Sequence, residues 1–282
     1  MTDIIAVIGA GQMGSGIAHV SAAAGIPVTM IDVSADALAK GKASIEKNFE
    51  RQIKKGTVDA ATRDAALAKL TTSTDLGAIA NATFVIEAAT ENVQLKFKIF
   101  GEIDRLASAG AILATNTSSI SITEIAAKTK RPEHVIGMHF MNPVPVMQLV
   151  EIIRGLATSP ETLQRTLALA TSLGKTPCEA HDYPGFIANR ILLPMINEAV
   201  YCLMEGVGTT EAIDTVMKLG MNHPMGPLAL ADLIGLDTCL AILEVLHDGL
   251  GDSKYRACPL LRQYVAAGWL GRKSGRGFYT YA

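Results

Sequence analysis

The stretch Ile4-Ile5-Ala6-Val7-Ile8-Gly9-Ala10-Gly11-Gln12-Met13-Gly14 decides the fold. Its five leading apolar residues predict a buried strand, and the G-x-G-x-x-G pattern follows at once. The segment 15–24 then predicts an amphipathic helix. Glycines in this context permit a tight turn and let backbone N–H groups approach a pyrophosphate at the helix N-terminus. A dinucleotide-binding, Rossmann-type unit is therefore predicted, and a glycine-rich turn in an unrelated α/β protein is the alternative.

Asp32 favours the dinucleotide interpretation and indicates which dinucleotide is bound. It ends the next predicted strand, 18 residues after Gly14. A carboxylate at that place accepts hydrogen bonds from the adenosine ribose hydroxyls and repels a 2'-phosphate. The nearest following cation is Lys40, so no adjacent base offsets that repulsion. We expect NAD as the cofactor.

The first 180 residues alternate short apolar runs with longer amphipathic stretches, which predicts βαβ units and a mostly parallel sheet. A polar, Lys-rich insert, about 34–69, is too long for a simple crossover and predicts a helical hairpin turning at Gly56-Thr57. The expected strands are Ile4–Ile8, Val28–Asp32, Thr83–Glu87, Ala111–Thr115 and Val135–His139, with weaker candidates at Leu149–Ile153 and Thr176–Ala180.

The pattern changes at Tyr183-Pro184-Gly185, beyond which the strand signal almost disappears. Helical stretches are expected at 187–204, 210–219, 228–250 and 260–267. We therefore predict an NAD-binding α/β domain over 1–183, followed by an all-α domain over 184–282.

The composition excludes several classes of protein. Hydrophobic residues make up 49% of the chain and charged residues 18%, which excludes a disordered chain and suits a buried subunit interface. A net charge of -2 offers no overall field for nucleic acid or an anionic membrane, and no apolar run is long enough for a membrane helix. The start of the chain leaves no room for a cleavable leader, so a cytoplasmic location is expected.

The cysteines show neither a C-x-x-C pair nor metal-ligand spacing. We expect free thiols in a reducing compartment and no metal site. They are Cys178, Cys202, Cys239 and Cys258.

His139 is the first candidate for catalysis because it lies at the carboxyl end of a predicted strand, where open α/β sheets bind ligands. Glu151 follows after Asn142-Pro143-Val144-Pro145, a run that cannot form a regular helix and can turn the chain back. In such a pair the imidazole takes an alcohol proton while the carboxylate holds it in place. A histidine without function is the alternative on spacing alone.

Ser118 and Asn189 are two further candidates. Ser118 follows another strand end, and an ordinary helix-capping loop explains it equally well. Asn189 is expected in the first turns of the second domain, where an amide can reach a substrate carbonyl across a cleft. A solvent-facing helical Asn is its alternative.

Lys47, Arg51 and Lys54 fall on one face of the expected insert helix. Coenzyme A carries several phosphate charges, so a mildly acidic protein needs such a local cationic patch to bind it. A solvated surface face is the alternative, and on the residues alone it is the favoured one.

Several ordered motifs together resemble the short-form 3-hydroxyacyl-CoA dehydrogenase family, and the likeness spans essentially the whole chain. It is closest to the family's bacterial 3-hydroxybutyryl-CoA branch. The motifs are Gly9–Gly14, Asp32, Glu91–Lys96, Asn116–Ser119, His139–Pro143 with Glu151, Asp182–Arg190, Asn222–Pro227 and Gly275–Tyr279.

The resemblance implies oxidation of (S)-3-hydroxyacyl-CoA by NAD, the reverse reduction, and a homodimer joined through the helical domains. His139 would be the general base with Glu151 orienting it, while Ser118 and Asn189 would bond the reacting oxygen region. Asn222 would complete the pocket. The insert would contact CoA, so the resemblance favours Arg51 and Lys54 as CoA-binding residues over a solvated surface face. The implied cofactor contacts are Gly9, Gly11, Gln12, Met13, Gly14, Asp32, Glu91, Lys96, Asn116, Ser118 and Asn142.

Two rival interpretations remain at this stage. One is a Rossmann dehydrogenase for a free hydroxy acid or sugar acid, of the 3-hydroxyisobutyrate or gulonate type; the first normally uses a lysine base, whereas this chain offers His139 with Glu151. The other is a non-catalytic NAD-binding or structural protein, against which the intact set of Ser118, His139, Glu151 and Asn189 argues.

Overall fold

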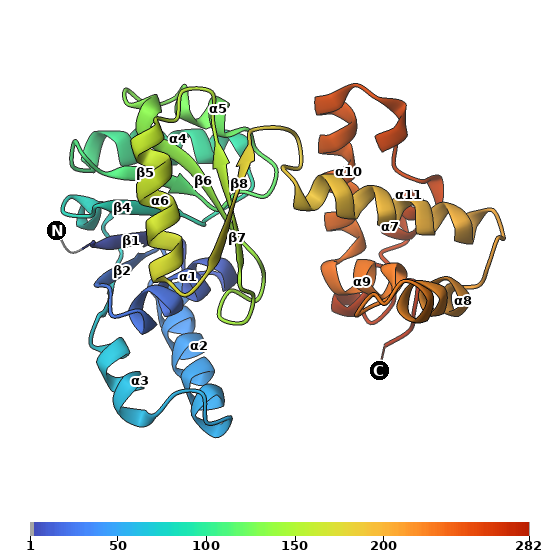
Figure 1. The fold of residues 1–282 in the computed structure, drawn as a ribbon, viewed down its shortest axis with the longest axis horizontal. Coiled ribbons are helices and arrows are strands. Elements are labelled where there is room, and N and C mark those ends of the chain that lie inside the picture. Colours follow the sequence, from blue (N-terminus) through green and yellow to red (C-terminus); the bar gives the residue numbers. More distant parts are fainter. Residues whose placement is uncertain (1–2, 282) are drawn as a thin grey trace. The chain divides into compact units, whose positions relative to one another are not determined.

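The computed structural model describes residues 3–281 and confirms the fold class, an α/β unit followed by a helical unit (Figure 1). The chain divides into two compact units between Tyr183 and Pro184. This boundary falls within the Tyr183-Pro184-Gly185 segment where the sequence pattern changes.

The described part of the first unit contains one eight-stranded sheet in the order β3-β2-β1-β4-β5-β6-β7-β8. Neighbouring strands are parallel except for β6 and β7, which are antiparallel. The strand order reverses beside β1, so the carboxyl ends of β1 and β4 flank the crevice where such sheets bind ligands. The strands are β1 (Ile5–Ile8), β2 (Val28–Ile31), β3 (Leu70–Ser73), β4 (Phe84–Glu87), β5 (Ile112–Thr115), β6 (Val135–Phe140), β7 (Leu149–Arg154) and β8 (Thr176–His181).

Every expected strand is present, and β3 is an additional one. Its residues, Leu-Thr-Thr-Ser, are half-buried or exposed, and it lies at the edge of the sheet. An edge strand of this kind carries no apolar run, so it escapes detection by hydrophobicity. The strands β1, β4, β5 and β6 are fully buried instead, and this is the pattern of parallel strands covered on both faces.

Helices cover the sheet, and α6 crosses one of its faces in Figure 1. Most of these helices begin at a side-chain cap: Asn92 caps α4, Ser121 caps α5 and Ser159 caps α6. The helices are α1 (Gln12–Ala23), α4 (Val93–Leu106), α5 (Ile122–Ala126) and α6 (Pro160–Ser172), with two 3-10 turns, η1 (Leu76–Ile79) and η2 (Pro132–His134).

The insert is a helical hairpin, as the sequence predicts. Its helices α2 (Ala35–Lys54) and α3 (Ala60–Leu67) are separated by a turn at Gly56, which has a φ of +70°. Only one stripe of α2 is buried, formed by Leu38, Gly41, Ile45 and Phe49. The remaining faces of α2 are therefore open to ligands and solvent.

The second unit packs helices around its own apolar core. The stretch 228–250 is two helices, because Gly235 between them has a φ of +103°, a conformation outside the helical region. The helices are α7 (Ala188–Met204), α8 (Thr210–Thr215), η3 (Val216–Gly220), α9 (Pro227–Ile234), α10 (Leu236–Leu250), η4 (Ser253–Tyr255), α11 (Pro259–Ala266) and η5 (Arg272–Ser274). Among residues 3–281, no helix combines the length and apolar character needed to span a membrane.

His19 makes the stability of the first unit depend on pH. It is 1% exposed in α1 and stacks on Phe49 of α2, with 4.1 Å between the ring centroids. Burial lowers the pKa of His19 to about 4. In the unfolded chain the pKa of a histidine is about 6.5. Between pH 6.5 and pH 4 the unfolded state therefore binds a proton at His19 and the folded state does not, so lowering the pH favours unfolding.

We expect the free energy of unfolding to fall by about 2 kcal/mol between pH 7 and pH 5 through this residue alone. His19→Phe keeps an aromatic ring and should remove that part of the pH dependence. Urea unfolding of both proteins at the two pH values measures it. The same pH dependence in both proteins would show that His19 is not the source.

Candidate active site

The glycine-rich turn joins β1 to α1, and its three glycines serve different purposes. Gly9 has a φ of +104°, and a Cβ there would lie 2.6 Å from the carbonyl oxygen of Ala88. A Cβ on Gly14 would overlap the carbonyl oxygen of Gly9. Gly11 differs, because a Cβ there would meet no atom within 4 Å. Packing within the protein therefore explains Gly9 and Gly14 but not Gly11.

The N-terminus of α1 offers backbone donors to an anion. Its N-cap, Gly11, supplies no side-chain hydrogen bond, and its first turn holds no acidic residue. The first N–H groups of a helix have no partner within the helix and carry partial positive charge. The open space at Gly11 and these donors together fit the pyrophosphate of a dinucleotide.

Asp32 lies where the adenosine ribose is expected, just after β2 and half-buried. Its Oδ2 accepts a hydrogen bond from the Ala10 N–H at 2.9 Å, and its Oδ1 accepts one from the Ser34 N–H at 3.0 Å. The carboxylate is thereby fastened to the glycine-rich turn. Its remaining acceptor positions suit ribose hydroxyls.

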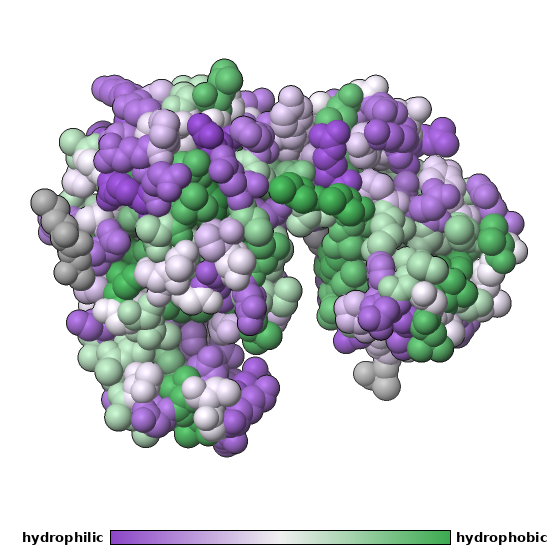
Figure 2. Space-filling view, viewed as in Figure 1, coloured by the Kyte–Doolittle hydropathy of each residue, from purple (hydrophilic) through white to green (hydrophobic). Residues whose placement is uncertain are grey.

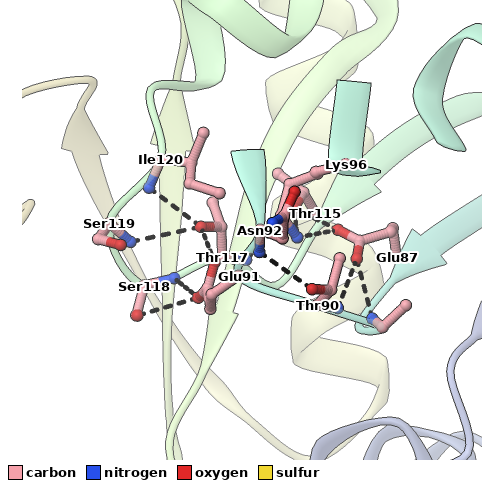
Figure 3. Close-up of polar contacts among 11 residues, drawn as sticks. Glu87, Thr90, Glu91, Asn92, Lys96, Thr115, Thr117, Ser118, Ser119 and Ile120 are labelled. Carbon is pink, nitrogen blue, oxygen red and sulfur yellow. Dashed lines mark hydrogen bonds and ion pairs between the residues drawn. The ribbon is translucent and has the colours of Figure 1, made fainter. Parts of the chain in front are cut away.

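A buried ion pair supports the loop that follows β4 (Figure 3). Glu87 Oε2 pairs with Lys96 Nζ and accepts a hydrogen bond from the Thr115 hydroxyl at 2.8 Å. Its other oxygen accepts from the backbone N–H groups of Ala89 and Thr90. Because Glu87 and Lys96 are at most 1% exposed, the pair braces the loop from beneath.

Glu91 holds the Ser118 segment from that same loop (Figure 3). Its Oε1 accepts from the Ser118 N–H at 2.7 Å and from the Ser118 hydroxyl at 3.0 Å, and its Oε2 accepts from the Thr117 hydroxyl at 2.7 Å. Ser118 is not itself the N-cap of the following helix, because Ser121 caps α5. Glu91 and Lys96 also line a pocket of about 240 Å³ with Met13 and Asn116.

His139 and Glu151 form the expected pair. They face each other across the antiparallel strands β6 and β7, and His139 Nδ1 lies 2.8 Å from Glu151 Oε2. His139 is 8% exposed and Glu151 2%. A carboxylate only accepts, so this contact selects the tautomer with a proton on Nδ1 and makes Nε2 the basic nitrogen.

Asn142 and Asn116 connect the end of β6, the strand of His139, to the glycine-rich turn and to the residue that follows β5. The Gln12 amide donates to Asn142 Oδ1 at 3.0 Å, and the Phe140 N–H donates to Asn116 Oδ1 at 2.9 Å. The glycine-rich turn, the Ser118 segment and the end of β6 thus belong to one hydrogen-bonded surface. The expected cofactor residues and the histidine pair are brought together there.

The remaining expected residues lie elsewhere in the two units. Arg51 and Lys54 are exposed on α2, away from its buried stripe. In the helical unit, Asn189 lies half-buried in the first turn of α7, and Asn222 lies exposed between η3 and α9 with a φ of +56°.

Three residues of the site escaped the sequence analysis: Glu87, Thr115 and Thr117. Each stands at or just after the end of an expected strand, next to the ligand crevice. A polar side chain at such a strand end was the available signal.

Comparison with known proteins decides the family. Residues 4–183 match the model of the 3-hydroxyacyl-CoA dehydrogenase NAD binding domain, and residues 185–281 match that of the 3-hydroxyacyl-CoA dehydrogenase C-terminal domain. The chain belongs to the 3-hydroxyacyl-CoA dehydrogenase family. It is an NAD-dependent dehydrogenase.

Three members of the family resemble this chain over nearly their full length. A probable 3-hydroxybutyryl-CoA dehydrogenase of Bacillus subtilis is 60% identical over 98% of this chain and 96% of its own. A 3-hydroxybutyryl-CoA dehydrogenase of Bradyrhizobium diazoefficiens is 57% identical over 98% of this chain and 94% of its own. The crystal structure of (S)-3-hydroxybutyryl-CoA dehydrogenase from Ralstonia eutropha superposes with a TM-score of 0.98, at 51% identity and 100% coverage of both chains.

Substitutions at Gly11 and Gly14 should affect different properties, cofactor binding at Gly11 and stability at Gly14. We expect Gly11→Ala to keep its melting temperature but to weaken NADH binding by about 10- to 100-fold, as the loss of hydrogen bonds to a charged group does. Gly14→Ala should instead cost about 1–3 kcal/mol of stability through overlap with the Gly9 carbonyl. Calorimetric melting and NADH fluorescence titration test both variants. If Gly11→Ala binds NADH as tightly as the unaltered protein, the pyrophosphate does not lie against Gly11.

Proposed function

We propose that this protein interconverts short-chain (S)-3-hydroxyacyl-CoA, above all (S)-3-hydroxybutyryl-CoA, and the 3-oxoacyl-CoA, with NAD as the hydride carrier. The observation that carries the proposal is the contact between His139 and Glu151 at the carboxyl end of β6, beside the cofactor turn. The relatives named above support the choice of substrate. The decisive assay is NADH oxidation with acetoacetyl-CoA, compared with free acetoacetate.

His139 acts as the proton-transfer group in this proposal. In oxidation its Nε2 takes the proton of the 3-hydroxyl group while the hydride leaves that carbon, and in reduction it returns the proton to the oxygen. Glu151 holds the Nδ1 proton and stabilises the imidazolium that forms. Because Glu151 is buried in β7, it is held in place for this task.

The cofactor side is built from groups that the fold already orients. Bound NAD would supply the hydride acceptor, with its pyrophosphate at the glycine-rich turn of Gly9, Gly11 and Gly14 and its ribose at Asp32. The other proposed cofactor contacts belong to the hydrogen-bonded surface beside His139 or to the loops next to it. They are Gln12, Met13, Glu91, Lys96, Asn116, Ser118 and Asn142.

Ser118 and Asn189 complete the substrate side, with Asn222 as a further contact. The position of Ser118 supports its role, because its backbone N–H and its hydroxyl both donate to Glu91 beside the crevice. We assign Ser118 and Asn189 to hydrogen bonds around the reacting oxygen. Asn222 would contribute an exposed amide from the helical domain.

Arg51 and Lys54 are the proposed contacts for the phosphates of CoA. Both are exposed on α2, and hydrophilic side chains gather over the α2 side of the insert in Figure 2. A dehydrogenase for a free hydroxy acid or sugar acid would have no use for this face. A non-catalytic NAD-binding protein would have no use for a buried histidine–glutamate pair.

The helical domain is the proposed dimerisation domain. An apolar groove of about 470 Å³ runs between α7 and α8, and Val207 and Val216 at its edge are 73% and 60% exposed. Exposed apolar surface of this kind favours burial against a second copy. The four free cysteines are consistent with a cytoplasmic location, which we also propose.

His139 and Glu151 should behave as one unit. His139→Ala should lower kcat by about 10²- to 10⁴-fold with little change in NADH affinity. Glu151→Gln should also lower kcat, and the double variant should be little worse than the worse single one. His247→Ala, at a half-buried position of α10, and Glu161→Gln, at an exposed position of α6, are the control variants. Full kcat in Glu151→Gln would contradict the pair and leave His139 as the base on its own.

The basic face of α2 should affect the binding of CoA esters more than the binding of NADH. Lys54→Ala should raise the KM for acetoacetyl-CoA by about 2- to 5-fold, as expected for an exposed charge, and the effect should shrink at high salt. The KM for NADH should change less. Lys98→Ala, an exposed lysine of α4, is the control. If the KM for acetoacetyl-CoA is unchanged after both Arg51 and Lys54 are replaced, this face does not contact CoA and is an ordinary solvated surface.

Sedimentation equilibrium at micromolar concentration should give the mass of a dimer. Val207→Lys with Val216→Lys should shift it towards the monomer, because charges placed in an apolar interface lose their hydration. A monomer mass for the unaltered protein would exclude the proposed dimer.

A further inference from the structure

Asp214 of α8 and Asp232 of α9 are buried carboxylates of the helical unit that the proposed reaction does not use. Asp214 is 5% exposed and Asp232 1%. A charge in such a place is stable only when hydrogen-bond donors surround it. The donors here come from the start of α9 and from the C-terminal segment 277–281, so the two carboxylates connect three separate parts of the unit.

Asp214 caps α9 from the neighbouring helix. The N-cap of α9 is Gly226, which has no side chain to serve as a cap. Asp214 Oδ1 accepts from the Leu228 N–H and its Oδ2 from the Ala229 N–H, both at 2.9 Å. A Cβ on Gly226 would overlap the Asp214 carboxylate, so this approach requires glycine. The first turn of α9 is therefore fastened to α8, which lies beside it (Figure 1).

This cap closes the chain between α8 and α9 into a loop. Residues 216–226 leave α8 through η3 and return to the start of α9, and Asn222 lies within them with a φ of +56°. Inside the loop the His223 N–H donates to the Met217 carbonyl oxygen at 3.1 Å. Because one carboxylate joins the two ends of the loop, the position of Asn222 depends on the orientation of Asp214.

Tyr279 fixes that orientation. Its hydroxyl donates to Asp214 Oδ2 at 2.9 Å, and its backbone N–H donates to Asp232 Oδ2 at 2.9 Å. Burial and the hydrogen bond to Asp214 raise the pKa of Tyr279, so the hydroxyl keeps its proton and remains a donor near neutral pH. Tyr279 thus connects the capping carboxylate with the body of α9.

Resting on the proposed function, we propose that Asp214 and Tyr279 are positioning residues for Asn222, the proposed substrate contact of the helical domain. They hold the loop 216–226 in the conformation that presents the Asn222 amide and take no part in proton transfer. Loss of the Tyr279 hydroxyl should therefore lower kcat/KM for the acyl-CoA. NADH binding, which the first unit provides, should not change.

Tyr279→Phe tests this proposal because it keeps the ring and removes only the hydroxyl. It should lower kcat/KM for acetoacetyl-CoA by about 2- to 10-fold, as the loss of one hydrogen bond does. Tyr281→Phe is the matched control, because its hydroxyl comes from the same segment and donates to Asp232 at 2.9 Å instead. Its kcat/KM should stay within about twofold. The melting temperatures of both variants should fall by similar amounts, and fluorescence titration should give an unchanged Kd for NADH.

A double-mutant cycle shows whether Tyr279 acts through Asn222. Asn222→Gly removes the amide and adopts the positive φ without strain. It should itself lower kcat/KM, and Tyr279→Phe should then add less than about twofold, because a positioning residue has no effect once the group that it positions is gone. Full kcat/KM in Asn222→Gly would exclude the substrate contact and this inference with it.

The outcomes separate this inference from the proposed function. No turnover of acetoacetyl-CoA by the unaltered protein overturns both. Normal turnover with an unchanged kcat/KM in Tyr279→Phe overturns the positioning role alone. An equal loss in Tyr279→Phe and Tyr281→Phe also overturns it, because the hydroxyls would then support only the fold of the helical unit. So does a full effect of Tyr279→Phe in the Asn222→Gly background, since Tyr279 would then act on another part of the site.

Discussion

Helix α1 reaches the sheet because Gly14 has no side chain, and the whole site depends on that close approach. Any larger residue would meet the carbonyl oxygen of Gly9, and a side chain on Gly9 would meet the backbone that follows β4. The turn is therefore wedged between β1 and β4. From there the Ala10 N–H reaches Asp32 after β2, and the Gln12 amide reaches Asn142 beyond β6. One compact turn thus sets the positions of residues from three other parts of the sheet.

Carboxylates do most of the remaining positioning. Asp32, Glu87 and Glu91 stand at or just after strand ends, and each accepts backbone N–H groups of a neighbouring loop. Asp182 does the same at the end of β8, where it accepts from the Ser121 hydroxyl and from two N–H groups at the start of α5. Charge-assisted bonds of this kind are stronger than neutral ones. The loops of the crevice are consequently ordered before any ligand arrives.

The paired histidine follows from a different rule, the register of β6 and β7. In an antiparallel pair the residue opposite a given position is set by the loop between the strands. Here the loop places Glu151 across from His139, and Lys175 holds that loop through two of its carbonyl groups. A shift of one residue would turn Glu151 to the other face of the sheet and remove it from the histidine.

The sequence by itself determined what depends on local geometry and periodicity: the glycine-rich turn, the buried strands, the hairpin at Gly56 and the change of pattern at Pro184. These features follow from φ preferences and hydrophobic spacing, which are properties of short segments. It left undecided whether His139 meets Glu151, and it did not reveal β3, the break at Gly235 or the bracing by Glu87. It also did not indicate that Asp214 and Tyr279 meet at the start of α9. Only the tertiary structure decided these, because each depends on which distant segments lie side by side, and a contact between remote residues leaves no periodic mark in either one.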